Sequence, residues 1–194
     1  MLFRSLFGSR TFSGVNLLTL FLYGALGGAF FLLPFLLIQA HGFSATAAGA
    51  VYLPFTLVLA ALSRWSGGLV DRFGARRPLI IGPVIAAVGF ALLALVSGER
   101  PYWAYLGPMI VLGFGMAVTV APLTTTVINS VPERETGVAS GVNNVVAAVA
   151  SLLVVAVLGT LVADSLVATA RVVMSTAAAL ALASAAAAAL TIRI

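Results

Sequence analysis

The sequence predicts an all-α, polytopic membrane protein with six transmembrane helices. Of its 194 residues, 62% are hydrophobic and 8% are charged, and the mean hydropathy is +1.18. Soluble domains carry about 25% charged residues, so a soluble fold could not bury this much apolar surface. The few charges are also clustered, and arginine is distributed unevenly along the chain. These observations predict the number of helices, their limits and their orientation.

The charge-free stretches of the chain have the dimensions of membrane spans. They are Thr11–Ser63, Pro78–Gly98, Pro101–Pro132, Thr136–Ala163 and Val172–Ile192. A hydrocarbon core about 30 Å thick needs about 20 helical residues, so the first stretch holds two spans and each of the others holds one. Their continuous apolar character favours helices over the alternating strands of a membrane barrel. The predicted spans, which form a single bundle over residues 1–194, are Gly14–Ile38, Ala45–Val70, Pro78–Ser97, Trp103–Ile128, Gly137–Val162 and Val172–Ile192.

The first and last spans need separate arguments. The opening MLFRSLFGSR is basic, as in a secretory signal peptide, but the apolar run behind it is longer than the roughly 7–15 residues of such a peptide. We therefore interpret it as the start of an uncleaved first span. The last span is rich in alanine, which favours insertion only weakly, and its prediction depends on its charge-free length.

The arginines predict the orientation of the chain, because positively charged loops remain cytoplasmic. With the N-terminus inside, the cytoplasmic side carries Arg4, Arg10, Arg64, Arg72, Arg76, Arg77, Arg134 and Arg193, and the outer side carries Arg100 and Arg171. Both termini are therefore predicted to be cytoplasmic. The net charge of +5 and the pI near 10.8 do not indicate a nucleic-acid partner, because the basic residues lie at membrane boundaries rather than on one soluble face.

The predicted spans differ in polarity. The first carries Asn16, Thr19 and Tyr23 at helical spacing, the fourth carries Thr124–Thr126, and the fifth carries the pair Asn143-Asn144. The third and sixth carry almost no polar residues. Polar side chains usually face a bundle interior or a wet cavity, so we expect the third and sixth spans to face lipid. The plainest helix is then the third of each set of three, as in a three-plus-three inverted repeat.

The loop between the second and third spans contains the most informative motif, GGLVDRFGARR. Its marked residues are Gly67, Gly68, Asp71, Arg72, Gly74, Arg76 and Arg77. The motif resembles the signature loop of the major facilitator superfamily, which joins the second and third helices of each six-helix half. The resemblance implies that Asp71 is a conformational latch against a helix end or basic group of the opposite half. The glycines have a simpler interpretation, close helix packing, which also applies to Gly24-x-x-x-Gly28 and Gly137-x-x-x-Gly141.

A second resemblance is more specific and covers nearly the whole chain. Residues 113–157 contain Pro-Leu-Thr-Thr, the turn Val-Pro-Glu-Arg and Gly-x-Ala-Ser-Gly-x-Asn-Asn in that order. Together with residues 10–16 and 42–49, they resemble the C-terminal region of the fourteen-span drug:proton antiporters. The resemblance implies proton-coupled efflux of a drug or other small molecule across a bacterial plasma membrane by the complete protein. One departure is Ala147-Ala148, because close relatives would carry an arginine between Asn144 and Leu152.

Polar residues inside the spans are candidates for a substrate cavity. The candidates are Asn16, Tyr23, Thr124, Thr125, Asn143 and Asn144. The two adjacent asparagines are the strongest, although interhelical hydrogen bonding is an equally good use of their amides. Adjacent residues diverge by about 100° around a helix, so at most one of them faces the cavity squarely. Glu133 and Glu135 follow Pro132 at the start of the fifth span, and we interpret them as charges that stabilise the helix N-terminus.

The absence of certain residue types from the sequence excludes several classes of function. With no cysteine, one histidine and no acid inside a span, neither a metal site nor a catalytic triad can be assembled, so we expect no enzyme, metal or cofactor. The membrane acid and Gly-Pro-rich motif that the resemblance implies for an antiporter's N-terminal half are also absent. We therefore expect a C-terminal half or fragment that works in the bilayer with an N-terminal half, or by self-association, on an unidentified small molecule. The alternative is an autonomous membrane module, such as an oligomeric channel or a structural protein.

Overall fold

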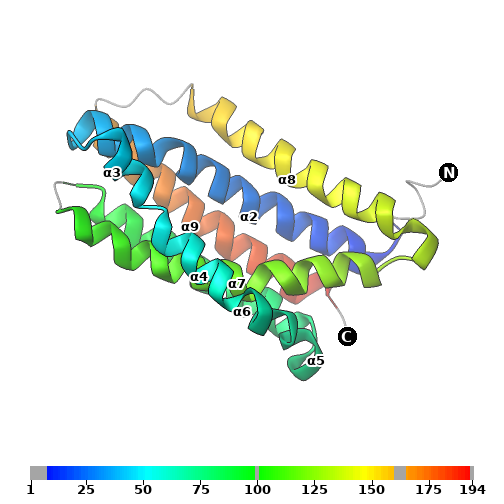
Figure 1. Cartoon of the computed structure of the whole chain (residues 1–194). Helices are drawn as coiled ribbons and strands as arrows, with labels where there is room; N and C mark the ends of the chain where they lie inside the picture. Colours follow the sequence, from blue (N-terminus) through cyan, green and yellow to red (C-terminus); the bar gives the residue numbers. More distant parts are fainter. Residues whose placement is uncertain (1–7, 99–100, 160–164, 193–194) are drawn as a thin grey trace.

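The computed structural model describes residues 8–98, 101–159 and 165–192, and every element in them is helical. Six segments of this part of the chain are long and apolar enough to cross a membrane, which confirms the predicted all-α membrane fold. They lie side by side in one bundle (Figure 1). The elements are α2 (Arg10–Phe35), η1 (Leu36–Ala40), α3 (Ala45–Ala50), α4 (Leu53–Gly67), α5 (Leu69–Phe73), α6 (Arg76–Val96), η2 (Tyr102–Tyr105), α7 (Leu106–Asn129), η3 (Glu133–Glu135), α8 (Thr136–Leu158) and α9 (Leu166–Thr191).

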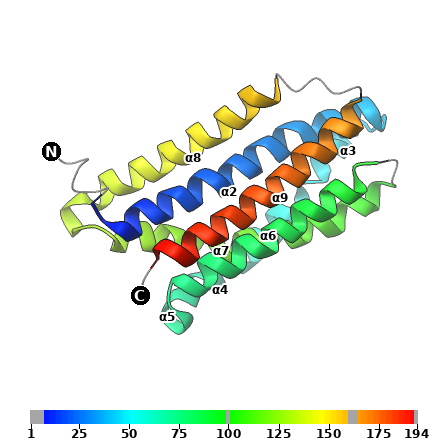
Figure 2. The ribbon, with the colours of Figure 1, turned by 180° about the vertical axis from the view of Figure 1, so that it is seen from behind.

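The two ends of the bundle differ in charge. Helix α2 begins, and α9 ends, at the end that carries α5 (Figures 1 and 2). We call this the α5 end and the opposite one the α3 end. The α5 end carries Arg10, Arg64, Arg72, Arg76, Arg77 and Arg134, and the α3 end carries Arg171; Arg4, Arg100 and Arg193 lie outside the described residues. Among the described arginines, the asymmetry that predicted the orientation is therefore present in three dimensions.

The helix contacts repeat between the first and second sets of three spans. Helix α2 packs against α8 and α9, and α7 packs in the corresponding way against α4 and α6. The third helices of the two sets, α6 and α9, pack against each other. Figure 2 shows the helices α8, α2, α9 and α6 side by side in that order. Exchanging the two sets leaves this contact pattern unchanged, as a three-plus-three repeat requires.

Glycines bring neighbouring helices together at the closest contacts. A Cβ atom added to Gly115 of α7 would lie 2.5 Å from the backbone nitrogen of Ala86 in α6. A Cβ added to Gly24 or Gly28 of α2 would lie 3.3 or 2.6 Å from side-chain carbons of Val154 in α8. The predicted packing role of Gly24 and Gly28 is confirmed by these distances. Small residues at such positions replace the hydrophobic driving force that is missing between helices in lipid.

The exposed helices of this chain are not the ones with the fewest polar residues. In the most apolar window of each span, 44% of the residues are buried for α6 and likewise for α9, against 17% for the α3–α4 span and 6% for the η3–α8 span. Low polarity led us to expect the third and sixth spans to face lipid. In the described chain α6 and α9 pack on each other, and Ile81, Leu95, Val172 and Leu190 form exposed apolar surface on them. That this surface faces lipid stays a prediction.

The second predicted span, Ala45–Val70, is not one helix. It breaks at Val51-Tyr52 between α3 and α4, and α5 follows α4 as a separate short helix. Pro54 in the first turn of α4 has no N–H and cannot donate to a preceding carbonyl, so the helix is interrupted before it.

The predicted fifth span ended at Val162, and its residues 160–162 lie outside the described residues.

Candidate functional site

The signature loop, residues 67–77, turns the chain from α4 into α6 through the short helix α5. Gly74 ends α5 with φ 71° and ψ 165°, a backbone conformation that side chains with a Cβ rarely adopt. Helix α6 starts two residues later. The turn therefore explains why the motif needs glycine at this position.

Other glycines of the sequence motifs do not pack against anything. A Cβ added to Gly67, Gly137 or Gly141 would meet no atom within 4 Å, and one added to Gly68 would meet only the carbonyl oxygen of Trp65 at 3.7 Å. These four glycines therefore make no close helix contact within the described chain, and their packing role stays a prediction. Gly137 and Gly141 lie on α8, the helix that the rest of the chain covers least.

The charges of the signature loop fall into two groups. Arg76 Nη2 donates a hydrogen bond of 2.8 Å to the carbonyl oxygen of Ala189, in the last turn of α9. The last carbonyls of a helix lack backbone partners and carry partial negative charge, so this guanidinium caps α9. Asp71, Arg72 and Arg77 are exposed and form no ion pair with a described residue. Arg76 thus binds another helix of the same bundle. The charges of Asp71, Arg72 and Arg77 remain available to groups outside the bundle.

A polar cluster joins α8 to α2. Asn143 Nδ2 donates to Asn16 Oδ1 at 3.2 Å and to Thr19 Oγ1 at 2.8 Å. Asn16 and Thr19 are buried and donate in turn to the carbonyls of Phe12 and Val15. We call Asn16, Thr19 and Asn143 the α2–α8 cluster. Of the two readings of Asn143, cavity lining and interhelical bonding, the bonds of this residue match the second.

The remaining cavity candidates are separate from the α2–α8 cluster. Asn144 is exposed on α8, as the 100° divergence of adjacent residues predicted. The Tyr23 ring is half-buried, and its hydroxyl makes no hydrogen bond to a described residue. Thr124 is exposed and Thr125 half-buried, and each donates to the carbonyl four residues earlier in α7, at 3.1 Å.

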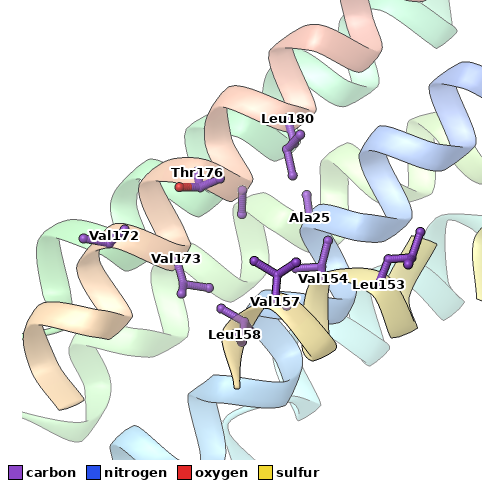
Figure 3. A pocket seen from close by; sticks show the side chains of 11 residues that line it. Ala25, Leu153, Val154, Val157, Leu158, Val172, Val173, Thr176 and Leu180 are labelled. Atoms are coloured by element: carbon purple, nitrogen blue, oxygen red, sulfur yellow. The ribbon is translucent and has the colours of Figure 1, made fainter. Parts of the chain in front are cut away.

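Among the cavities of the described chain, two lie beside helix α2, and one of them includes the predicted cavity residue Thr125. The first, of about 500 Å³ at the α5 end, is lined by Val70, Gly74 and Ala75 of the signature loop and by hydroxyl and amide groups that include Thr125, Thr126 and Asn129 of α7. An apolar one of about 220 Å³ lies over α2 between α8 and α9, where Val154, Val157 and Val173 surround it (Figure 3). Thr176 contributes the only side-chain hydroxyl of its lining.

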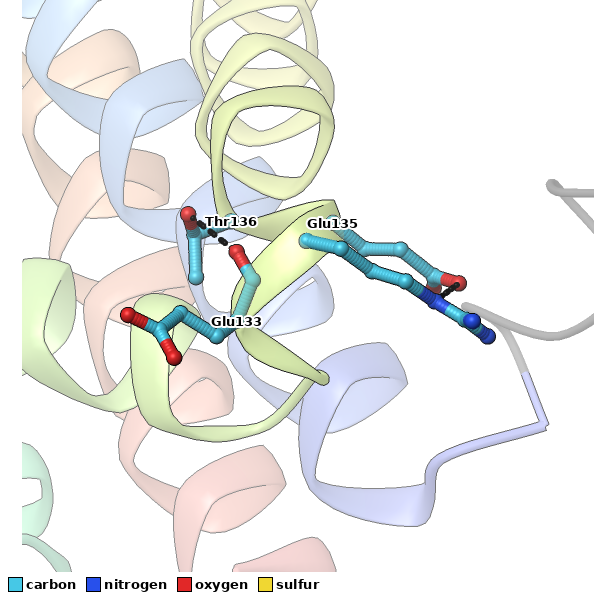
Figure 4. A network of polar contacts seen from close by, with 4 residues as sticks. Glu133, Glu135 and Thr136 are labelled. Atoms are coloured by element: carbon cyan, nitrogen blue, oxygen red, sulfur yellow. Dashed lines mark hydrogen bonds and ion pairs between the residues drawn. The ribbon is translucent and has the colours of Figure 1, made fainter.

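The acids before α8 make fewer capping contacts than we expected. Helix α8 has no side-chain hydrogen bond at its N-cap, and Thr136 donates to the backbone carbonyl of Glu133 at 2.9 Å (Figure 4). Glu135 is buried, and its carboxylate lies 3.5 Å from Nε of the exposed Arg134. Any stabilisation of the helix dipole by these charges therefore acts through space. Among the described residues, no group of three His, Cys, Asp or Glu could hold a metal ion.

Sequence reasoning missed several polar contacts. Ser151 donates to the carbonyls of Tyr23 and Ala147 at 3.1 Å, which adds a second tie between α8 and α2. His41, expected to be solvated or interfacial, is half-buried with Nε2 2.9 Å from the hydroxyl of the buried Tyr105. The helical spacing of Ser151 from Asn143 was an available signal. The pairing of His41 with Tyr105 had no such signal, because the two residues are 64 positions apart.

The sequence profile described as Major Facilitator Superfamily matches residues 2–155 of this chain. The chain belongs to the major facilitator superfamily. Several of its curated superfamily relatives are resistance or export proteins. It is 33% identical over 131 residues to the multidrug resistance protein Stp of Mycobacterium tuberculosis, an alignment that covers 68% of this chain and 24% of that protein. It is 28% identical over 152 residues to the tetracenomycin C resistance and export protein of Streptomyces glaucescens, covering 78% and 28% of the two chains.

The match to the methylenomycin A resistance protein of Bacillus subtilis is 27% identical over 159 residues and covers 81% of this chain and 34% of that protein. The chain thus spans about a quarter to a third of the length of these three relatives. Its fold resembles that of a bacterial homologue of the human drug peptide transporters PepT1 and PepT2, with a TM-score of 0.73 and 18% identity over 91% of this chain and 41% of that one. The bundle is consistent with half of the superfamily fold, and the superfamily consists of membrane transporters rather than enzymes.

Proposed function

We propose that this chain forms the C-terminal half of a proton-coupled efflux transporter for a drug or another small molecule. The observation that carries the proposal is the uncovered surface of α4 and α8, since a bundle that fills its own interior would not leave two of its six spans so exposed. The substrate site of such transporters lies between two halves. The names of the relatives, which refer to drug resistance and export, support efflux as the direction of transport.

The α2–α8 cluster and Asn144 have different roles in this proposal. Asn143 uses its amide to hold α8 against α2, which turns the neighbouring Asn144 outward. In a complete transporter Asn144 would then line the space between the halves, with Tyr23, Thr124 and Thr125 as further polar groups. The proton-binding acid would belong to the other half, because the described acids of this chain all lie near the α5 end.

Replacing Asp71 with asparagine in a complete transporter that contains this chain is expected to lower turnover about three- to tenfold. The proposed latch between Asp71 and a helix end of the other half would contribute about 0.3–1 kcal/mol when exposed and up to about 2 when partly buried, and loss of that energy shifts the equilibrium between conformations. Initial efflux rates at matched protein abundance measure the effect.

Glu133→Gln is the matched control, because Glu133 is also an exposed carboxylate at the α5 end. It should leave turnover unchanged. Equal loss of turnover in both variants would show a general effect of surface charge, and unchanged turnover in Asp71→Asn would reduce Asp71 to a topology residue.

We expect the α5 end, with both termini, to face the cytoplasm of a bacterial plasma membrane, because positive loops are retained there. The chain has no cysteine, so single cysteines can be labelled without background. A cysteine at Phe73 should react with a membrane-impermeant maleimide only after the membrane is opened, whereas one at Trp103 should react in intact cells. Both positions are exposed, at opposite ends of the bundle. The reverse pattern would overturn the orientation and the half-transporter proposal with it.

A further inference from the structure

The apolar cavity over α2 is a groove between α8 and α9, and we call it the α8–α9 groove. Neither of these helices packs chiefly on the other, because α8 packs on α2 and α7, and α9 packs on α2 and α6. The floor of the groove is buried and consists of Ala25, Gly28, Val173 and Ala177. Its rim includes Leu153, Val157 and Val172, each of which is more than half exposed. The groove therefore opens to the outside of the bundle.

The α8–α9 groove follows the helix axes. Its lining residues on α9 lie along one face from Val172 to Leu180 (Figure 3), a length of about 12 Å. Helix α9 starts at Leu166 at the α3 end, so these positions lie about 9–21 Å along a helix that crosses a core about 30 Å thick. The groove is thus at the depth of the acyl chains of one leaflet, the leaflet at the α3 end.

The chemistry of the lining selects an apolar occupant. Thr176 carries the only side-chain hydroxyl of the lining, whereas a buried water needs about two to four polar partners. Apolar cavities of this size stay dry and accept apolar molecules. A space of about 220 Å³ that extends along α9 is also long and narrow, which suits a hydrocarbon chain better than a globular molecule.

The rim of the groove points away from the surface that we assign to the other half of the transporter. Leu153 follows Asn144 by nine positions, which places the two residues about 180° apart around α8. Asn144 is the residue that would line the space between the halves, so this step rests on the proposed function. The opposite side of α8, with Leu153, then faces the bilayer, whose acyl chains run along the spans.

We propose that the α8–α9 groove binds one acyl chain of a membrane lipid from the leaflet at the α3 end. The chain lies on the buried floor and fills the space between α8 and α9. Atoms that line a void lose their packing contacts on one side, and the bound chain restores these contacts.

The three-plus-three repeat places a corresponding space of about 600 Å³ between α4 and α6, over α7. None of the residues that line it is buried; they are Val58, Ala61, Leu62, Ile85, Ile110, Val111 and Phe114. Without a buried floor, this space should exchange lipid as freely as any other helix surface. It therefore serves as an internal reference for the α8–α9 groove.

The test is photocrosslinking of the full chain in nanodiscs that contain phosphatidylglycerol with a diazirine in one acyl chain. Two probes are compared, one with the diazirine in the middle of the chain and one with it at the end, and mass spectrometry locates the labelled residues. Both probes should label Val173 and Ala177, which the bundle shields from ordinary boundary lipid. With the headgroup at the α3 end, the mid-chain probe should favour Val173 and the end-of-chain probe Ala177.

Filling the groove should remove this labelling. Ala177→Phe places a ring in the groove and should abolish labelling of Val173, while labelling of Ile110 in the reference space stays unchanged. Ala177→Leu fills the groove in part and should reduce the labelling, and it serves as the test if the larger side chain prevents folding. Ala179→Phe is the matched control, because Ala179 is exposed on the same helix and lies outside the lining. It should leave labelling of Val173 as in the unaltered chain.

Labelling confined to the exposed rim would mean ordinary boundary lipid only and would overturn the proposal. A reversed order of the two probes, or undiminished labelling of Val173 in Ala177→Phe, would also overturn it. Crosslinks between two copies of the chain at the groove would identify a second copy as the occupant instead of lipid. Because the readout needs no transport, failure of this proposal and failure of the half-transporter proposal are distinguishable.

Discussion

Replacing Gly115 with alanine is expected to destabilise the bundle by about 2–3 kcal/mol. The added Cβ would lie 2.5 Å from the backbone nitrogen of Ala86 and 2.8 Å from the carbonyl oxygen of Gly82. Backbone atoms cannot rotate away as a side chain can, so α6 and α7 must separate, and overpacking of this kind typically costs about 1–3 kcal/mol. Reversible unfolding in mixed detergent micelles, followed by circular dichroism, measures the change.

The matched control is Gly107→Ala in the first turn of the same helix. A Cβ added to Gly107 would meet nothing within 4 Å, so only the higher helix propensity of alanine should act, and it favours the folded state by about 0.5–1 kcal/mol. The two substitutions in α7 should therefore have opposite signs. Equal effects would mean that the α6–α7 contact is looser than described.

The chain on its own is expected to insert into membranes but to move no drug against a proton gradient. Alternating access needs one bundle to move against another around a shared site, and the described spans provide one bundle. Purified chain in liposomes with an imposed proton gradient should transport ethidium no faster than empty liposomes. A complete superfamily transporter in parallel liposomes serves as the positive control.

Adding a complementary N-terminal half to the same liposomes distinguishes the proposal from its alternatives. Activity that requires both halves supports the half-transporter. Coupled transport by a proven monomer of this chain would overturn it. Gradient-independent ion leakage that scales with self-association would instead identify an autonomous oligomeric module, the alternative that composition alone left open.

The all-α membrane fold and the family could be predicted from the sequence because the information is local. A bilayer of fixed thickness requires a fixed length of apolar helix, and the charge-free stretches record that length directly. The turn of the signature loop is equally local, because the positive φ of Gly74 follows from the chemistry of a single residue. The break before Pro54 also has a local cause, but the sequence analysis predicted one continuous span there. Local signals also confined Asn143 and Asn144 to different faces of one helix.

Only the tertiary structure showed which residues contact partners that are distant in the sequence. Asn143 rather than Asn144 meets α2, and this choice depends on the rotation of α8 about its axis. Local sequence does not determine that rotation, because Asn143 and its partner Asn16 are 127 positions apart. Arg76 caps α9 through a carbonyl 113 positions away. Backbone acceptors of this kind have no sequence signature, because every residue carries the same carbonyl.

The burial of α6 and α9, the spans with the fewest polar residues, also depended on the tertiary structure. Hydropathy correctly placed the third and sixth spans in a membrane, yet it did not predict that α6 and α9 would pack on each other while α4 and α8 stay uncovered. In lipid an apolar side chain gains little by moving from acyl chains to another helix. Shape at small residues therefore determines which faces meet, and shape complementarity becomes visible only when both surfaces are in place.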